Sequence, residues 1–328
     1  MILGLLALSL RRRIHDLKLH HHHIRRLFSR MIWMLGLLSL SACTAVDLDA
    51  PPPVFDTGIN PESWAKVPAG EFLYGQHDEI VRLDYDYEIM ITDVTVAQYI
   101  EFLNAALKEG KVSIAEDAVT GFYPGDPFHG IKHEIRIDPA EYLFVPLNDP
   151  ASRFIFTNGQ FSVKPGWENH PMTNVSWFGA WSYCGFYEGR LPLETEWEKA
   201  ARGADGRPYP WGWTLALHNA NYYASRDPFE DMRSFGSRTT PVGFYNGSTY
   251  DGYATLDSAS PYGLYDMAGN VWQWLGDVQP QEGFSDRWMH GGSKDTYDMD
   301  LRIWVRNSAP PMYYSPGVGF RCVREPVE

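Results

Sequence analysis

Cysteine and histidine are the side chains with the most specific chemistry in this chain of 328 residues. The three cysteines are Cys43, Cys184 and Cys322. A thiolate is a nucleophile and a soft metal ligand, and an odd number of cysteines leaves one over after pairing. Each of the three thiols therefore requires its own assignment.

Histidines give a weaker signal for metal chemistry. His129 and His133 stand four residues apart beside Glu134, a spacing that suits a metal site on a helix, but Pro127 and Gly130 argue against a helix there. We therefore expect no metal at this position. The run of histidines at 20–23 lies in a leader segment and is not interpreted as a metal site either. No glycine-rich phosphate loop and no Gly-x-Ser-x-Gly elbow is present.

The first of the three cysteines closes what looks like a secretion leader, residues 1–42. An apolar run, Met31–Leu40, follows a basic stretch and is too short to span a membrane, for which about 20 residues are needed. The ending Leu40-Ser41-Ala42-Cys43 resembles the bacterial lipobox, which predicts cleavage before Cys43 and a lipid on its thiol. The alternative is an ordinary signal peptide with a chance cysteine. The leader is long, and translation could start near Met31.

Removal of the leader makes the chain more acidic. The formal net charge is −13, from 28 basic and 41 acidic residues. Seven of the basic residues and one acid precede Cys43, so the mature chain carries 21 basic and 40 acidic residues and a net charge of −19. Because an acidic surface repels phosphate, we expect no nucleic-acid partner. The main membrane contact is expected to be the lipid.

A tether follows the lipid site, and one domain follows the tether. Residues 43–62 include Pro51-Pro52-Pro53 and are typical of an extended linker. Thr44 is not the aspartate that retains lipoproteins of Gram-negative bacteria at the inner membrane, so we expect an envelope lipoprotein of the outer membrane, facing the periplasm or the surface. Residues 63–328 are predicted to form the domain, with an irregular insertion around 110–165.

The elements that must position any site are short. Helices are predicted from Thr95, an N-cap, to about Gly110, from Ser176 to about Tyr187, and over Glu194–Arg202. Strands are predicted at Glu71–Tyr74, Ile303–Arg306 and Gly319–Val323. Three helices among many short strands, with glycine and proline spread throughout, indicate an α+β fold with a high coil content.

Several collinear strings carry a family resemblance. They are Val67-Pro68-Ala69-Gly70-Glu71-Phe72, His170-Pro171, Asn174-Val175-Ser176-Trp177, Gly189-Arg190-Leu191-Pro192, Glu196–Gly203, Tyr262–Trp272, Gly291-Gly292-Ser293 and Gly319-Phe320-Arg321. In this order and spacing they resemble the formylglycine-generating enzyme family, the sulfatase-modifying factor domain also found in ergothioneine- and pyoverdine-pathway proteins. The resemblance covers Ser63–Glu325 and implies an irregular C-type-lectin-like α+β fold.

The resemblance also implies an oxidase site whose metal ligands are replaced here. Members hold copper(I) with two cysteines after the Gly-Gly-Ser string, and matching without gaps places Thr296 and Leu301 at those positions. Neither side chain can bind copper(I), which requires soft thiolates. The family's asparagine before Gly-Phe-Arg is Gly317. The resemblance leaves a set of pocket candidates, without confident catalytic residues: Trp274, His290, Ser293, Arg302 and Arg306.

Two further features come from the family pattern. Cys184 and Cys322 match cysteines that are disulfide-bonded in the family, and an exported location permits the bond. Calcium is the possible cofactor, and copper is not expected. The matching calcium ligands are Asn221, Tyr222, Gly269, Asn270, Val271 and Gln273, with Asp227 and Asp231 near the first site. Gln273 stands where the family has a glutamate, which weakens that second site.

Two functions follow from these observations, and whether the protein is an enzyme stays open between them. The favoured one is a membrane-anchored lipoprotein whose domain is a binding or scaffold module at the cell envelope, with an envelope protein or peptide as partner. Gliding-machinery lipoproteins that resemble this family offer a parallel. The alternative is a non-heme metal-dependent oxidoreductase acting in the same pocket on a peptide or siderophore-like substrate. Fold alone does not decide between them.

Overall fold

The computed structural model describes residues 50–128, 130, 135–223, 225–231, 236–278 and 285–327. These residues belong to one compact unit, Leu48–Glu328. Within them, no helix is both long and apolar enough to cross a membrane. Cys43 with its leader, and the set His129, His133 and Glu134, lie outside the described residues. What the sequence predicts for them stays a prediction.

The predicted helices are confirmed, and their ends have the expected caps. Helix α2 is Val96–Lys108, α3 is Trp177–Phe186 and α4 is Glu194–Arg202. At the start of α2, the Thr95 hydroxyl accepts from the Gln98 amide and the Gln98 side chain accepts from the Thr95 amide, a capping box. Gly203 ends α4 with a φ of 69°, which costs a glycine little.

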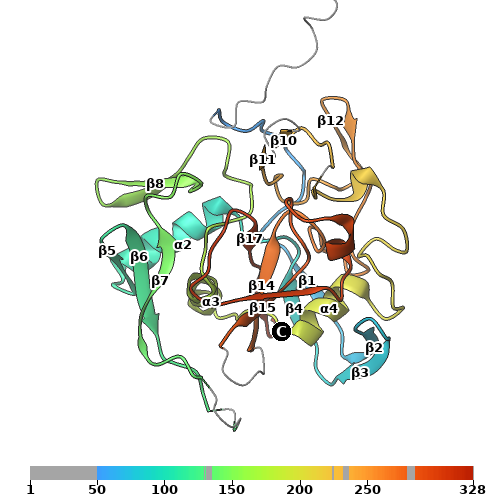
Figure 1. The fold of residues 1–328 in the computed structure, drawn as a ribbon, viewed down its shortest axis with the longest axis horizontal. Helices are drawn as coiled ribbons and strands as arrows, with labels where there is room; N and C mark the ends of the chain where they lie inside the picture. The colour runs from blue at the N-terminus through green and yellow to red at the C-terminus, as the bar shows by residue number, and fades with distance from the viewer. Residues whose placement is uncertain are drawn as a thin grey trace, which may run out of the picture. The chain divides into compact units, whose positions relative to one another are not determined.

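Two sheets form the centre of the domain. The first has the order β1-β4-β18, with β1 at Trp64–Val67, β4 at Tyr87–Met90 and β18 at Val323–Arg324. The second has the order β16-β15-β14-β17, with β16 at Arg306–Ala309, β15 at Arg287–His290, β14 at Trp272–Val278 and β17 at Val318–Gly319. Both α3 and α4 contact β14, and Figure 1 shows the β14–β15 pair between these two helices.

Smaller sheets surround this centre. One has the order β5-β6-β7, at Val112–Ala115, Ala118–Tyr123 and Ala140–Pro146. The pairs are β2 with β3, at Gly70–Tyr74 and Glu79–Leu83; β8 with β9, at Phe154–Thr157 and Gln160–Val163; β10 with β11, at Glu230–Asp231 and Gly236–Ser237; and β12 with β13, at Thr249–Tyr250 and Tyr253–Ala254. Short 3-10 turns lie at Leu217–Asn219 and Asp298–Leu301. The α+β prediction with many short strands is confirmed.

Three of the local predictions need correction. The strand expected at Ile303–Arg306 begins only at Arg306, because the Val305 amide closes a turn onto Arg302 and Ile303 is buried against α4. The strand expected at Gly319–Val323 is two strands in different sheets, β17 and β18. The segment around 110–165 is more regular than expected, since it contains the β5-β6-β7 sheet and the β8–β9 pair.

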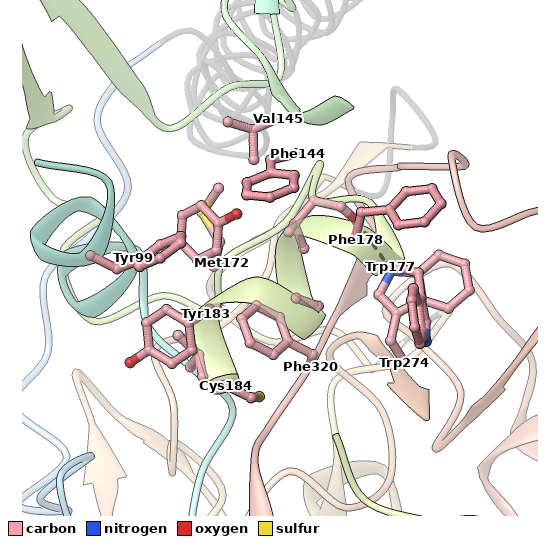
Figure 2. Close-up of a cluster of buried hydrophobic side chains, with 14 of the residues drawn as sticks. Tyr99, Phe144, Val145, Met172, Trp177, Phe178, Tyr183, Cys184, Trp274 and Phe320 are labelled. Carbon is pink, nitrogen blue, oxygen red and sulfur yellow. Dashed lines mark hydrogen bonds between the residues drawn. The ribbon is translucent and has the colours of Figure 1, made fainter. Parts of the chain in front are cut away.

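Aromatic packing on α3 forms the largest part of the core. Tyr183 stacks on Tyr99 at 5.7 Å between ring centroids and meets Phe320 edge-on at 5.4 Å. Figure 2 shows Trp177 and Trp274 at the other end of the same cluster. Rings of this size remove large apolar areas from water, so α3 is held mainly by its neighbours and needs little help from its own propensity.

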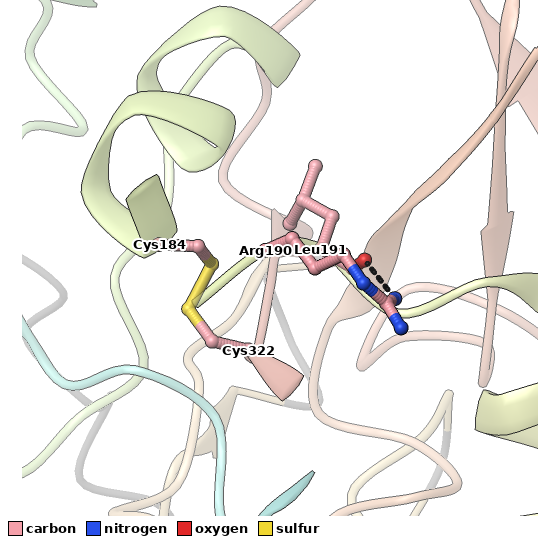
Figure 3. The surroundings of a disulfide bond; sticks show 4 residues. All are labelled: Cys184, Arg190, Leu191 and Cys322. Atoms are coloured by element: carbon pink, nitrogen blue, oxygen red, sulfur yellow. Dashed lines mark hydrogen bonds between the residues drawn. A yellow bond between two sulfur atoms is a disulfide. The ribbon is translucent and has the colours of Figure 1, made fainter. Parts of the chain in front are cut away.

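The disulfide predicted from the family pattern is present. Cys184 on α3 and Cys322 between β17 and β18 are bonded, with a Cα–Cα distance of 5.6 Å and a sequence separation of 138 (Figure 3). Backbone hydrogen bonds between Arg190 and Val323 in both directions hold the two segments together beside the bond. The bond therefore ties the last strand to the central helix.

Candidate functional site

The loop that follows β15 carries the positions where the family has its copper ligands. Thr296 closes a tight turn: its hydroxyl donates to the Ser293 carbonyl and accepts from the Ser293 amide, both at 2.9 Å. The Ser293 hydroxyl in turn accepts from the Asp295 amide at 3.3 Å. Both hydroxyls are thus engaged in shaping the loop.

Leu301 has a packing role. Its side chain is fully buried in a cluster with Tyr209, Tyr222 and Ala268. The 3-10 turn at Asp298–Leu301 directs it inward from the loop. The two positions that matter most for copper therefore hold a turn-closing hydroxyl and a core aliphatic side chain.

Gly317 lies directly against this loop. A Cβ at this position would lie 3.2 Å from an Asp295 carboxylate oxygen and 3.4 Å from the Ser293 hydroxyl. A larger side chain, such as the family's asparagine, would have to displace one of them. The Asp295 carboxylate instead bonds the Lys294 ammonium at 2.5 Å.

Cations gather on one side of the loop, in an otherwise acidic protein. Arg153 lies over the Trp167 ring at 3.7 Å, and Arg238 lies 5.9 Å from the same ring. Burial and the neighbouring Arg238 charge lower the pKa of Arg153 to about 10. Burial also lowers the pKa of Lys294, and the Arg153 charge adds to the effect. The field here is positive and strong enough to act on buried neighbours.

His170 is the neighbour most affected. The imidazole is fully buried beside Trp167, with ring centroids 4.7 Å apart, and one nitrogen lies 2.9 Å from the Thr239 hydroxyl. In the part of the chain that the structure describes, its other nitrogen, Nε2, has no hydrogen-bond partner. Burial first, and then the charge of Arg153, lower the pKa of His170 to about 3. The ring is therefore neutral at any physiological pH.

The pocket candidates do not converge on Ser293. His290 is fully buried and bonds the Glu194 carboxylate at 3.1 Å and the Ile303 carbonyl at 2.8 Å. Arg306 bonds the same Glu194 carboxylate and the Tyr74 hydroxyl. The histidine and this arginine thus belong to a structural cluster at the start of α4.

The remaining two candidates are separate from that cluster as well. Trp274 is fully buried in the core, where its indole nitrogen donates to the Val175 carbonyl at 3.1 Å. Arg302 is exposed on the surface. The expectation that these side chains would share one pocket with Ser293 is not supported by their placement.

The predicted calcium ligands divide into two groups with different fit. Gln273 does not fit, because its side chain is saturated. Its oxygen accepts from the Trp197 indole at 2.7 Å and from Arg321 Nε at 2.8 Å, and its nitrogen donates to the Asp266 carbonyl at 2.7 Å. The Gly269 and Asn270 carbonyls already accept from Val271 and Lys294 amides, and Val271 is fully buried. This second site has no free side-chain oxygen at Gln273 to offer an ion.

The Asn221 side fits better. Its side-chain oxygen is buried and has no hydrogen-bond partner among the described residues, while its nitrogen donates to the Arg238 carbonyl at 2.9 Å. The Tyr222 carbonyl accepts a hydrogen bond from the Ser225 amide. The Asp227 carboxylate accepts from the Ser225 and Tyr245 hydroxyls and from the Phe229 amide. Burial raises the pKa of Asp227 to about 6. The Asp231 side chain lies outside the described residues. Among described residues, no three His, Cys, Asp or Glu side chains gather as a metal site.

Sequence reasoning missed the residues that organise the centre. Arg321 is fully buried and bonds Asp93, Gln273 and the carbonyls of Met90 and Tyr265. The string Gly-Phe-Arg indicates a special position for Arg321. Two of its four partners, Met90 and Asp93, lie more than 200 residues away in the sequence. Only the fold brings them together.

Comparison with known proteins identifies the family. The sulfatase-modifying factor enzyme 1-like domain matches residues 56–326, and the chain belongs to this family. Formylglycine-generating enzyme from Mus musculus is 28% identical over 88% of this chain and 82% of its own length. Inactive C-alpha-formylglycine-generating enzyme 2, from the same organism, is 34% identical over 46% of this chain and 48% of its own.

A solved structure agrees on the fold. PvdO from Pseudomonas aeruginosa superposes with a TM-score of 0.52 and 21% identity, over 84% of this chain and 99% of that one. At this identity the likeness establishes the formylglycine-generating-enzyme fold alone. The chain spans 27% to 57% of the length of other curated relatives that it matches at 32% identity. The fold class predicted from the strings is confirmed.

Proposed function

We propose that this protein is a binding module of the cell envelope, anchored to a membrane through a lipid on Cys43, and that it does not generate formylglycine. The observation that carries the proposal is the state of the loop after β15. The Thr296 hydroxyl closes a turn onto Ser293, and Leu301 is buried in the core.

Copper chemistry needs ligands that this loop does not offer. Copper(I) is held by soft thiolates, and the residues from Gly291 to Leu301 include none. Cys184 and Cys322 are consumed by their disulfide. The relation to both active and inactive members of the family is compatible with a domain that keeps the fold and uses it for binding.

The alternative, a non-heme metal-dependent oxidoreductase acting on a peptide or siderophore-like substrate, has less support. It needs His290, Ser293 and Arg306 to share one pocket. His290 and Arg306 are both committed to Glu194, and the Ser293 hydroxyl to its own turn. The geometry favours a structural role for these residues over a catalytic one.

Copper binding tests the proposal directly. Purified mature protein is titrated against a chromophoric copper(I) chelator, beside the double variant Thr296→Cys/Leu301→Cys and the control Thr296→Ser. We expect no competition from the wild type or the control, and competition from the double variant if the fold tolerates both thiols. Stoichiometric copper or iron in the wild type after calcium removal, with oxygen uptake on a peptide or siderophore panel, would overturn the binding-module assignment.

Anchoring is tested separately. Metabolic labelling with a fatty acid is expected to mark the wild type and to leave Cys43→Ser unlabelled, with the variant recovered in the soluble envelope fraction. Membrane fractionation then distinguishes the outer membrane, which Thr44 favours, from the inner membrane. A labelled Cys43→Ser variant contradicts lipidation at this residue.

A further inference from the structure

A cavity of about 270 Å³ lies beside the disulfide, away from the loop after β15. Its walls come from the start of β1, from α2, from the end of α3 and from the last strand. The residues that matter for its chemistry are Glu62, Trp64, Glu101, Tyr183, Tyr187 and Arg324. A volume of this size is enough for one flexible side chain or a small molecule.

One wall of the cavity presents a phenol whose ring is fixed by its neighbours. Tyr183 is 5% exposed, and its ring is fixed by Tyr99 and Phe320. Tyr183 lines the cavity, and Figure 2 shows its hydroxyl on the edge of the ring that faces away from Phe320. A phenol with a fixed ring and a hydroxyl open to the cavity can accept a hydrogen bond from a ligand there.

Two carboxylates give the cavity a negative character. Glu62 accepts one hydrogen bond, from the Gln98 side chain at 2.7 Å, and Glu101 is exposed. Neither forms an ion pair with a described residue. Together with burial, both carboxylates raise the pKa of the Tyr187 phenol, so their charges act on the cavity wall.

Among the described lining residues, Arg324 is the one cation, and it is already paired. Arg324 bonds Glu88 at 2.8 Å and lies over the Trp64 ring at 4.2 Å. It therefore neutralises Glu88 and leaves Glu62 and Glu101 uncompensated. Aromatic rings beside uncompensated carboxylates attract an organic cation by two independent routes, charge and ring quadrupole.

We propose that this cavity binds a protonated primary amine on an aliphatic chain, as in a lysine side chain or a free diamine. An ammonium has three N–H donors, and Glu62, Glu101 and the Tyr183 hydroxyl offer three acceptors. The methylene chain would lie against Trp64 and Tyr187. The site does not depend on the function proposed for the loop after β15.

Calorimetric titration of the mature protein with cadaverine tests the site. We expect binding in the millimolar range or tighter at low ionic strength, weakened by added salt. The neutral analogue 1,5-pentanediol should not bind, and a fully N-methylated cadaverine should bind about tenfold more weakly, since it has no N–H to donate. N-acetyl-lysine amide in place of cadaverine distinguishes a lysine side chain from a free diamine as the source.

Variants connect the binding to the cavity. Glu101→Gln keeps the shape and removes one charge, and we expect a roughly tenfold weaker Kd for cadaverine. Tyr183→Phe keeps the ring packing and removes the hydroxyl, with an expected loss of about threefold. The exposed Glu141→Gln on β7 is the matched control and should leave the Kd unchanged. The proposal is overturned if cadaverine does not bind, if pentanediol or the methylated amine binds equally, or if Glu101→Gln binds like the control.

Discussion

Acid should destabilise this domain through His170, and the size of the effect can be worked out from its surroundings. The imidazole is fully buried between aromatic rings, and no described residue bonds its Nε2. Burial and the charge of Arg153 lower its pKa from the ordinary 6.5 to about 3. The native protein therefore stays unprotonated at this residue, while the unfolded chain binds a proton below about pH 6.5.

The sign and magnitude follow from proton linkage. Between the two pKa values the unfolded state holds more protons, so the free energy of unfolding falls by about 1.4 kcal/mol for each pH unit of acidification. Going from pH 7 to pH 5 should cost about 2 kcal/mol through His170 alone. The buried carboxyls of Asp227 and Asp266, whose pKa values burial raises to about 6, act in the opposite direction. Total stability therefore does not isolate the histidine.

A comparison of the wild type with the variant His170→Gln isolates the contribution of the histidine to the pH dependence of stability. Glutamine can still bond the Thr239 hydroxyl but does not titrate, and the carboxyl contributions are shared by both proteins. Urea unfolding, followed by tryptophan fluorescence at pH 7 and at pH 5, gives four free energies. We expect the loss on acidification to be about 2 kcal/mol smaller in the variant. Equal losses in the two proteins would refute the assignment of a neutral, strongly perturbed His170.

Other predictions concern the disulfide, the buried arginine and calcium. Replacing Cys184 and Cys322 together by alanine should lower the free energy of unfolding in urea by about 5 kcal/mol, because the bond closes a loop with a sequence separation of 138; a loss below about 1 kcal/mol would contradict this. Arg321→Met should cost about 3–5 kcal/mol in the same assay, since it leaves Asp93 buried without its cation; a neutral effect would show that the pair contributes nothing. Calcium should raise the Tm of the wild type in a chelator-controlled thermal scan and not that of Asn221→Ala; identical responses would exclude this site.

The helices could be predicted from the sequence because their signals are local. Thr95 and Ser176 are N-caps whose side chains accept the amides that the first turn leaves unpaired. The acids of Glu194 and Glu196 mark the start of α4, and Gly203 marks its end. The disulfide and the C-type-lectin-like form of the α+β fold were implied only by the family strings, since no local signal fixes a contact over a separation of 138 residues.

The strands and the site were harder to predict because their contacts are distant. Gly319 to Val323 looks like one strand, but its two ends pair with β14 and β4 in different sheets, and Arg321 turns inward between them. Likewise, the spacing of His290 and Ser293 does not predict their partners. His290 bonds Glu194 at the start of α4, and the Ser293 hydroxyl accepts from the Asp295 amide in its own turn. Three residues of separation is enough to place two side chains in unrelated surroundings.

Four of the strings that carry the family resemblance, together with Gln273, contribute to a buried polar framework, and this explains how a fold can persist where its catalytic positions differ. Trp197 and Arg321 both donate to the Gln273 side chain, which in turn donates to the Asp266 carbonyl. On the same helix as Trp197, Lys199 donates to the Pro68 and Gly70 carbonyls. Each of these buried groups is costly to leave unpaired, so each depends on its own partners staying in place. Thr296 and Leu301 lie outside this framework, and their identity can change without disturbing it.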